Sequence, residues 1–184
     1  DATSTWRDML RLLRRPLCAA ASPCTHEGTP STRTLVAFKH DAIQRRLLGE
    51  LLGRFERKGL KLVGMRMRTP SRALAEEHYE DHRGKPFFER ACVHLCSGPV
   101  VATVWEGRHA VAAARSLCGA TEPTEAIPGT IRADYCVHWR RNLVHSSDSD
   151  ATAQREISLW FGDGELEPWD EAAAGFYYEL PTSK

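Results

Sequence analysis

The chain has 184 residues, of which 42% are hydrophobic and 27% charged, which is ordinary for one globular domain with a substantial core. Its 25 basic and 24 acidic side chains leave a formal net charge of +1, so no specific nucleic-acid partner is expected. No stretch approaches the roughly 20 apolar residues that a membrane-spanning helix requires.

The first 33 residues differ from the rest of the chain. Residues 6–15 place arginines and leucines at helical spacing, and a loop-like tract rich in Ala, Ser, Thr and Pro follows up to Arg33. A segment rich in arginine, amphipathic and poor in acid is typical of a mitochondrial transit peptide. We therefore expect residues 1–33 to be a transit segment or its remnant in a mitochondrial protein. The alternative is a basic arm without an address function, in a cytoplasmic protein.

The six cysteines follow no disulfide framework, which favours a reducing compartment. Cys92 and Cys96 flank His94, but this is not a recognised zinc spacing. Buried or inert thiols are the favoured interpretation, with metal binding there as the minor alternative.

The globular region is predicted to begin with a short buried strand at residues 34–38. Asp41 can cap the next helix, whose apolar residues recur on one face from residue 43 to residue 55 and which ends at Lys58-Gly59. Alternation over residues 60–67 predicts a second strand, and Thr69-Pro70-Ser71 opens a helix through about residue 81.

The second half of the chain continues the alternation of strands and helices. The apolar run at residues 100–105 is typical of a central strand, and an alanine-rich helix follows over residues 108–117. After a long loop, residues 135–138 are predicted as the fourth strand and residues 150–161 as the last helix.

This order predicts an α+β fold: a ferredoxin-like βαββαβ four-stranded antiparallel sheet with covering helices on one face. The domain is expected to span residues 34–179, followed by a C-terminal tail at residues 180–184. No internal repeat or second domain is evident in the sequence.

The segment before the last helix carries the most informative chemistry. His145 is flanked by Asn142, two serines and Asp148 at what is predicted to be the end of a strand. Imidazole is nucleophilic near neutral pH when it is neutral and a partner holds its second nitrogen, and Glu156 is a candidate partner. Spacing alone leaves a surface or capping histidine as the commoner case.

The run Asn142 to Ser149 closely resembles the nucleoside diphosphate kinase signature, in which Asn, His, Ser and Asp occur at the same spacing. The resemblance extends over residues 34–179. Further landmarks of the family recur in chain order at residues 34–39, 54–59, 77–79, 85–88, 97–101, 104–107, 128–134 and 156–161.

The resemblance implies a ping-pong kinase that moves the γ-phosphoryl group of a nucleoside triphosphate, such as ATP, to a nucleoside diphosphate through a phosphohistidine. The implied catalytic residues are His145, Glu156, Lys39, Tyr79 and Ser147, with Glu156 orienting the imidazole and Ser147 supporting it. The implied nucleotide-binding residues are Lys39, Phe87, Arg115, Thr121, Arg132 and Asn142.

The implied roles divide by chemistry. Lys39, Arg115 and Arg132 would hold phosphates, as cations do, and the absence of a Walker A loop leaves this work to side chains. Thr121 would contact the β-phosphate, Asn142 the ribose, and Phe87 would stack on the base. Mg²⁺ is expected to arrive with the nucleotide, without direct protein ligands and with Asp148 reaching it through water at most.

The chain departs from the family after Lys39, where it has His40-Asp41-Ala42 instead of Pro-Asp-Gly. Loss of the proline and the glycine predicts a modest loss of rigidity next to the phosphate site. No side chain with a direct role in phosphoryl transfer is missing.

Family members assemble as hexamers or, less often, tetramers, and a hexamer is expected here. Residues 123–129 resemble the segment at the threefold centre, and residues 175–179 resemble the terminal arm that reaches a neighbour. Arg83 and Lys85 suggest weak contact with anionic lipid. The alternatives to an enzyme are a catalytically silent scaffold, which the retained His145 argues against, and a nucleic-acid-binding protein, which the net charge does not support.

Overall fold

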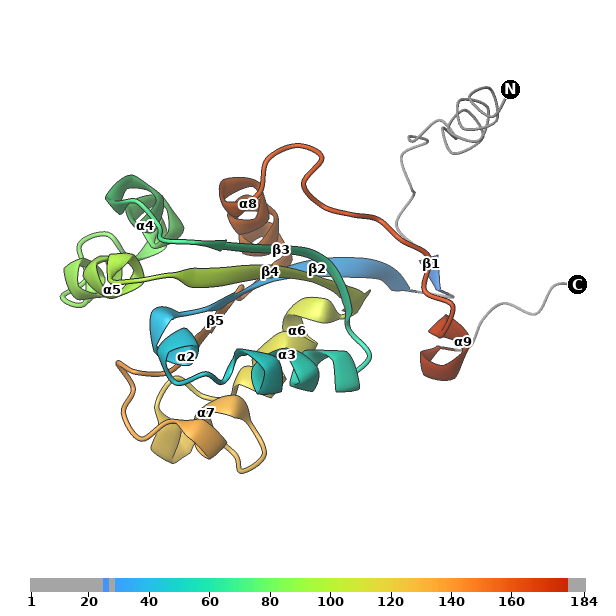
Figure 1. The fold of residues 1–184 in the computed structure, drawn as a ribbon, viewed down its shortest axis with the longest axis horizontal. Helices are drawn as coiled ribbons and strands as arrows, with labels where there is room; N and C mark the ends of the chain where they lie inside the picture. Colours follow the sequence, from blue (N-terminus) through green and yellow to red (C-terminus); the bar gives the residue numbers. More distant parts are fainter. Residues whose placement is uncertain (1–24, 27–28, 179–184) are drawn as a thin grey trace, which may run out of the picture.

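A computed structural model describes residues 25–26 and 29–178 of the chain (Figure 1). Most of the predicted leader and the whole predicted tail lie outside the described residues. The strands are β1 Thr25–His26, β2 Thr29–Phe38, β3 Lys61–Arg68, β4 Val100–Arg108 and β5 Val144–Ser146. The α-helices are α2 His40–Gln44, α3 Leu48–Arg57, α4 Arg72–His78, α5 Phe88–Cys96, α6 Ala110–Cys118, α7 Ile131–Tyr135, α8 Asp150–Trp160 and α9 Ala174–Tyr177. Two 3-10 turns, η1 Glu80–His82 and η2 Pro123–Glu125, complete the elements.

The strands form one sheet in which every neighbouring pair is antiparallel. β4 lies between β2 and β3, while β1 and β5 both pair with β2. The register places Leu35 opposite Val104 and Ala37 opposite His145. Without the short β1, the order and directions are those of the predicted ferredoxin-like sheet, which is confirmed.

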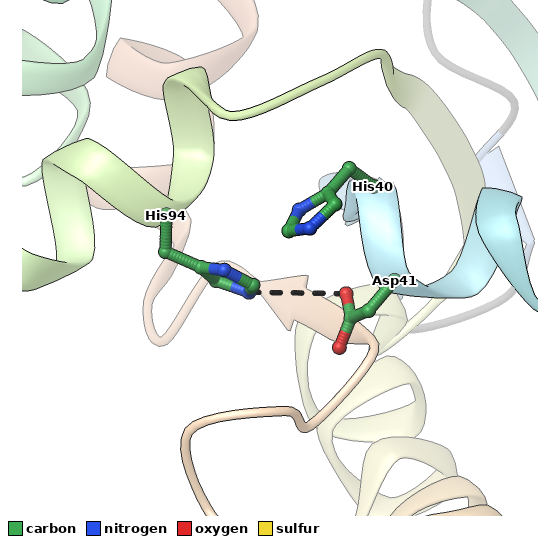
Figure 2. A group of neighbouring side chains, drawn as sticks. All are labelled: His40, Asp41 and His94. Atoms are coloured by element: carbon green, nitrogen blue, oxygen red, sulfur yellow. Dashed lines mark ion pairs between the residues drawn. The ribbon is translucent and has the colours of Figure 1, made fainter.

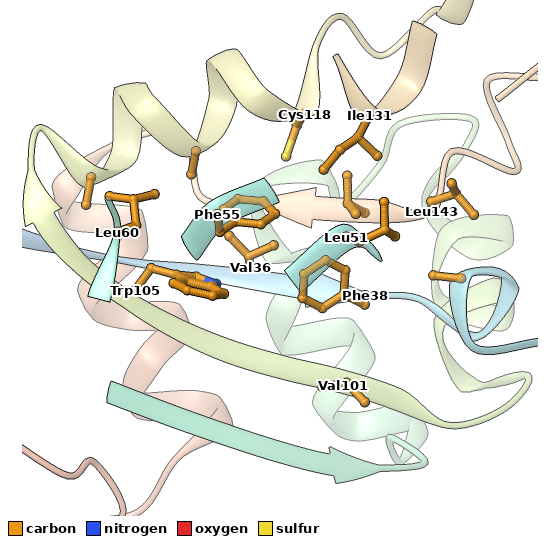
Figure 3. Packing of buried hydrophobic residues seen from close by; sticks show 14 of the residues in the cluster. Val36, Phe38, Leu51, Phe55, Leu60, Val101, Trp105, Cys118, Ile131 and Leu143 are labelled. Atoms are coloured by element: carbon orange, nitrogen blue, oxygen red, sulfur yellow. The ribbon is translucent and has the colours of Figure 1, made fainter. Parts of the chain in front are cut away.

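Helices cover both faces of the sheet, so the prediction of helices on one face is wrong. On one face, α3, α6 and α7 pack over a cluster that contains Phe38, Phe55 and Trp105 (Figure 3). On the other face, α4, α5 and α8 pack over a cluster that contains Leu35 and Trp160. The physical reason lies in β2, where both alternating sets of side chains are apolar and buried, so each face needs a cover.

Two strand predictions need correction. The first strand begins at Thr29 rather than residue 34, because the pairing of β2 with β4 extends to Ser31 opposite Arg108. The predicted strand at residues 135–138 is not one, since Tyr135 ends α7. The fourth strand is β5, so His145 lies in a strand and not in a loop.

The helix predictions need four corrections. The helix expected up to Lys58 is broken at Arg46, which has a φ of 57°, into α2 and α3. Asp41 does not cap α2, whose N-cap is Lys39, but accepts a hydrogen bond from the Leu143 amide at 3.1 Å. The helix expected through residue 81 ends at His78, followed by η1, and α5 was not predicted.

None of the helices in the described ranges is long and apolar enough to span a membrane.

Candidate active site

His145 lies at the centre of β5, where its backbone pairs with Ala37 of β2. Helix α8 follows directly and brings Glu156 to the imidazole: Nε2 lies 2.8 Å from Oε1 and 3.0 Å from Oε2 of the carboxylate. The hydroxyl of Ser147 donates to Oε2 of Glu156 at 2.6 Å. The side chain of Glu156 is 2% exposed and that of His145 is 22% exposed. The carboxylate is therefore a buried support, and the imidazole remains accessible.

The electrostatics around Glu156 keep this carboxylate ionised. Burial disfavours its charge, but His145, together with the hydroxyl of Ser147, more than offsets burial, so the pKa of Glu156 lies below its usual value. An ionised carboxylate only accepts hydrogen bonds, so the proton of a neutral His145 resides on Nε2. Nδ1 then carries the lone pair, and no group in the described residues hydrogen-bonds to it. The arrangement presents Nδ1 as a nucleophile.

His78 is a site residue that sequence reasoning missed. Its ring meets that of His145 edge-on, with 4.3 Å between the centroids, and its Nδ1 lies 3.7 Å from Oε1 of Glu156. The indole of Trp160 donates to the same Nδ1 at 3.3 Å. Burial, reinforced by His145, holds the pKa of His78 well below its usual value, so this histidine is neutral. The landmark Glu77-His78-Tyr79 contained the residue, but nothing in the spacing distinguished it from a core histidine.

A cavity of about 680 Å³ opens beside His145. It brings together residues from separate parts of the chain, and five of the predicted site residues besides His145 and Glu156 line it: Tyr79, Arg115, Thr121, Arg132 and Asp148. Its remaining lining includes Asp81 and Arg155, which pair at 2.9 Å and were not predicted. The volume is in the range of small-molecule sites and suits a nucleotide.

Arg132 is held rigidly at the cavity wall by backbone carbonyls. Its Nη1 donates to the carbonyl of Gly119 at 2.7 Å and its Nη2 to that of Val144 at 2.8 Å. Its Nε is buried without a hydrogen-bond partner among the described residues. Val144 directly precedes His145 in β5, so the fixed guanidinium contributes a preorganised positive charge near His145.

Lys39 and Asn142 lie beside the cavity rather than in its lining. The ammonium of Lys39 donates to the side-chain carbonyl of Asn142, and the backbone amide of Lys39 donates to the carbonyl of Leu143 at 2.8 Å. Burial lowers the pKa of Lys39 to about 8, with Asp41 opposing this shift and Arg132 adding to it. These contacts tie Lys39 to the segment that leads into β5.

Tyr79 and Phe87 are the two aromatic residues predicted for the site. Tyr79 meets His145 edge-on with 6.3 Å between ring centroids, and burial raises the pKa of its phenol, which stays protonated. Phe87 is 39% exposed and does not line the cavity. It contacts the ring of His82, which does, with 5.2 Å between centroids. Phe87 therefore contacts a residue of the cavity lining without being part of that lining.

Asp148 is the predicted site residue that could interact with a Mg²⁺ ion bound to the nucleotide. Hydrogen bonds to Asp148, from Thr152 first of all, lower the pKa of this carboxyl, so it is ionised. Asp148 offers an oxygen ligand at the cavity wall, which matches the sparse protein ligation typical of Mg²⁺.

Comparisons with known proteins agree with this geometry. The family model described as nucleoside diphosphate kinase matches residues 32–166. A nucleoside diphosphate kinase from Synechococcus sp. (strain CC9605) is 55% identical over 147 residues, which cover 80% of this chain and 97% of the relative. Nucleoside diphosphate kinase 3 from Mus musculus is 48% identical over 157 residues, 85% of this chain and 92% of the relative. The structure of a halophilic nucleoside diphosphate kinase from Halobacterium salinarum in complex with CDP is 45% identical, with a TM-score of 0.79, over 81% of this chain and 99% of that one.

Proposed function

This chain belongs to the nucleoside diphosphate kinase family, and we propose that it transfers the phosphoryl group through Nδ1 of His145. The observation that carries this proposal is the contact of Nε2 with Glu156 at 2.8 Å, which leaves Nδ1 as the free nitrogen of an accessible imidazole. The activity itself, phosphoryl transfer from a nucleoside triphosphate to a nucleoside diphosphate, follows from the family.

The reaction divides into two half-reactions. Nδ1 attacks the γ-phosphorus of the first nucleotide, the bond from this phosphorus to the β–γ bridging oxygen breaks, and the diphosphate leaves. The imidazolium that forms keeps its Nε2 proton in the hydrogen bond to Glu156, so the ionised carboxylate stabilises the developing positive charge. A second diphosphate then takes the phosphoryl group from Nδ1 by the reverse of these steps.

The cations around the cavity stabilise the charge that spreads over the transferred group. Arg132 is preorganised by its two backbone carbonyls, and Arg115 lines the same cavity. Lys39 is the third cation, in reach through Asn142. Thr121 also lines the cavity, which supports the assignment of its hydroxyl to the β-phosphate.

The proposal for the sugar and the base rests on the same neighbourhood. Asn142 contacts the ribose 3′ hydroxyl, and its hydrogen bond to Lys39 couples sugar binding to phosphate binding. Phe87 stacks on the base at the rim, where His82 joins it to the cavity. Stacking accepts every base, in accordance with a broad nucleotide range.

We further propose that the nucleotide brings Mg²⁺, with Asp148 as the side chain that holds one of its waters. The cation would neutralise phosphate oxygens as charge moves onto the leaving diphosphate. Asp148 is ionised and lines the cavity, which supports this assignment.

A transfer experiment with the isolated phosphoenzyme tests the two half-reactions. Protein that has been treated with Mg²⁺ and ATP labelled in its γ-phosphate, and then freed of nucleotide, should carry the label and pass it to added GDP. His145→Gln should carry no label, and His138→Gln, which changes an exposed histidine, should behave as the wild type. Failure of the labelled protein to form labelled GTP would contradict the ping-pong order.

We propose a hexamer as the assembly. Ile127, in the loop expected at the threefold centre, is 74% exposed in the single chain, and Phe176 near the C-terminus is also exposed. The ring of Tyr177 packs against Gly59 of the same chain. A Cβ added to Gly59 would lie 2.9 Å from the ring of Tyr177. Light scattering of the purified protein should give six times the chain mass; four times would support the tetramer.

We propose weak anionic-lipid contact and a mitochondrial location as separate properties. Arg83 and Lys85 are exposed, and each also lies near an aromatic ring, Phe88 and Phe87 respectively. Cardiolipin vesicles should co-sediment with the protein at physiological salt, and no binding would reject the contact.

The proposed mitochondrial location rests on the composition of residues 1–33 alone, and the cyanobacterial relatives lend it no support. A fluorescent protein fused behind residues 1–33 should enter mitochondria; a cytoplasmic signal would reject the leader.

A further inference from the structure

His40, Asp41 and His94 form a compact cluster of side chains outside the catalytic cavity (Figure 2). One ligand-capable atom of each residue lies within 4.8 Å of those of the other two. His40 and Asp41 belong to the first turn of α2, whereas His94 comes from the last turn of α5. The two imidazole rings meet edge-on with 4.6 Å between their centroids. The fold thus brings two imidazoles and a carboxylate together from distant parts of the sequence.

Two atoms at the centre of this cluster are buried without a hydrogen-bond partner in the described residues: Oδ1 of Asp41 and Nε2 of His94. They face each other across 3.9 Å, which is too long for a hydrogen bond. Asp41 is only 8% exposed, and its other oxygen is fixed by the backbone amide of Leu143 at 3.1 Å. A buried carboxylate oxygen that is held in place and left unpaired is unfavourable unless a hydrogen-bond donor or a cation occupies the gap, and a cation also balances the charge.

Ser97 holds the ring of His40 by hydrogen bonding. The hydroxyl of Ser97 donates its proton to the carbonyl of His94 at 2.7 Å, so it accepts from the ring of His40, whose Nδ1 lies 3.1 Å away and whose Nε2 lies 3.4 Å away. A neutral His40 donates through only one of these nitrogens, which leaves the lone pair of the other for a metal ion. This is the arrangement of a metal-binding histidine, in which a second group holds the other nitrogen.

We propose that His40, Asp41 and His94 bind a divalent transition-metal ion of the Zn²⁺ class, with water in the fourth position. Two imidazoles and one carboxylate are a ligand set that three-ligand zinc sites use. Zinc bonds of about 2.0–2.1 Å place tetrahedral ligand atoms about 3.3–3.4 Å apart, so Nε2 of His94 and Oδ1 of Asp41 must approach each other by about 0.5 Å and no pair by more than about 1.5 Å. Mg²⁺ prefers oxygen ligands and should not compete.

The site depends on a feature that sets this chain apart from its family. His40 occupies the position at which the resemblance predicts a proline, and proline offers no ligand. The proposed ion is therefore a property of this chain and not of the phosphotransfer reaction. Two of its proposed ligands, His40 and Asp41, directly follow Lys39 in the sequence. Asp41 also accepts a hydrogen bond from the backbone amide of Leu143.

Arg141 opposes metal binding in a way that can be measured. Its Nη1 lies 2.8 Å from Nδ1 of His94. A guanidinium only donates, so Nδ1 accepts and the proton of His94 resides on Nε2. Metal binding at Nε2 requires the other tautomer and the departure of Arg141, whose position at the surface permits this movement. In Arg141→Gln, the amide oxygen can accept from Nδ1 instead, and one positive charge is removed, so the metal should bind more tightly.

The test is a calorimetric titration of the full chain with Zn²⁺ in the presence of excess Mg²⁺, repeated with Co²⁺ to read the ligand field by absorption. We expect one site that weakens about tenfold or more in His94→Gln and in His40→Gln, and that tightens in Arg141→Gln. His138→Gln, a matched change at an exposed histidine, should leave the affinity unchanged. His145→Gln should also leave it unchanged, because the site is separate from the catalytic histidine.

Three results would overturn the proposal: no Zn²⁺ bound by the wild-type chain, binding that survives loss of both His40 and His94, or binding lost in His145→Gln. The last would place the ion at His78, His145 and Glu156 instead. Circular dichroism verifies that each variant folds. If His94→Gln does not fold, the opposite sign expected for Arg141→Gln still decides the question. The readout is metal affinity, so it is independent of phosphotransfer.

Discussion

At the scale of single residues, the two nitrogens of His145 differ: Nε2 is held by Glu156, and Nδ1 is the proposed nucleophile. Glu156 and Ser147 form a buried hydrogen-bonded support at Nε2 of the ring, and the imidazole lines the cavity. His78 fills the space beside the ring as a neutral imidazole. Among the described residues no group hydrogen-bonds to Nδ1, the proposed nucleophile.

Glu156→Gln tests the support. The amide keeps the shape and one acceptor but removes the negative charge that stabilises the imidazolium, so kcat should fall about 10- to 100-fold, the range typical when a carboxylate that orients a functional histidine is lost. KM should change little, because Glu156 does not contact the nucleotide. Glu76→Gln, a change in a surface pair with Arg72, serves as the control and should leave kcat unchanged. An unaltered kcat in Glu156→Gln would contradict the role.

The buried ammonium of Lys39 predicts a pH dependence of nucleotide binding. Its pKa is about 8 in the free protein, chiefly because burial disfavours the charge. As the pH rises through about 8, the free protein loses this cation, so the dissociation constant for ADP should increase over a range in which an ordinary lysine is still charged. Calorimetric titrations between pH 6.5 and about pH 9.5 measure this change. In Lys39→Arg the side chain stays charged, so the increase should disappear; an identical increase in that variant would assign it to another group.

At the scale of secondary-structure elements, the hydrophobic pattern predicted most of the long elements, although it missed the nine residues of α5, and it failed at the short β5. β4 and α8 were predicted because nine and eleven residues carry a pattern that is easily read. β5 has three residues, one of them His145, and too few apolar positions to show a period. Its place is determined by pairing with β2, which is a tertiary effect.

The break between α2 and α3 was hidden for a related reason. No proline or glycine marks it, and Arg46 adopts its positive φ without the residue type that usually does so. Apolar residues continue on one helical face through the break, so the pattern alone suggested one helix. The break directs α2 toward Leu143 and lets Asp41 hold that amide, a contact between residues about a hundred positions apart.

The capping residue of α4 offers a stability test away from the site. The hydroxyl of Ser71 accepts from the amide of Leu74 at 3.2 Å, and this N-cap was predicted to open the helix. Ser71→Ala should lower the free energy of unfolding by about 1 kcal/mol, and Ser71→Asp should restore most of it because aspartate also caps. Urea unfolding at one fixed protein concentration measures both changes. Equal loss in both variants would contradict a capping role, and kcat should be unaffected in each.

At the scale of the whole molecule, the sheet order could be predicted because the alternation of elements restricts the topology to few solutions. The two-sided cover could not be predicted from that alternation, but the fully buried β2 requires it. His145 and its candidate partner Glu156 could be singled out from the residues alone, but the proposed phosphate-binding cations were assigned only through the resemblance, since Lys39, Arg115 and Arg132 taken singly look like surface charges. Their shared position around one cavity or beside it depends on the fold, which spacing does not reveal.

The site as a whole draws on both faces of this sheet. α8 and its Glu156 belong to the face that α4 and α5 also cover, whereas α6 and α7 bring Arg115 and Arg132 from the other (Figure 1). β5 is the short edge strand at which the two sets meet. The proposed phosphate-binding arginines and the proposed orienting carboxylate therefore come from helices on different faces of the sheet.

The most direct measurement of the central claim is the position of the phosphoryl group on the trapped intermediate. The protein is incubated with ATP and Mg²⁺, denatured in alkali, in which phosphohistidine persists, and analysed by ³¹P NMR and by peptide mass spectrometry. The account predicts one phosphoryl group per chain, on Nδ1 of His145, absent in His145→Gln and labile to acid. Phosphorus on Nε2 of His145, or on another residue, would contradict it.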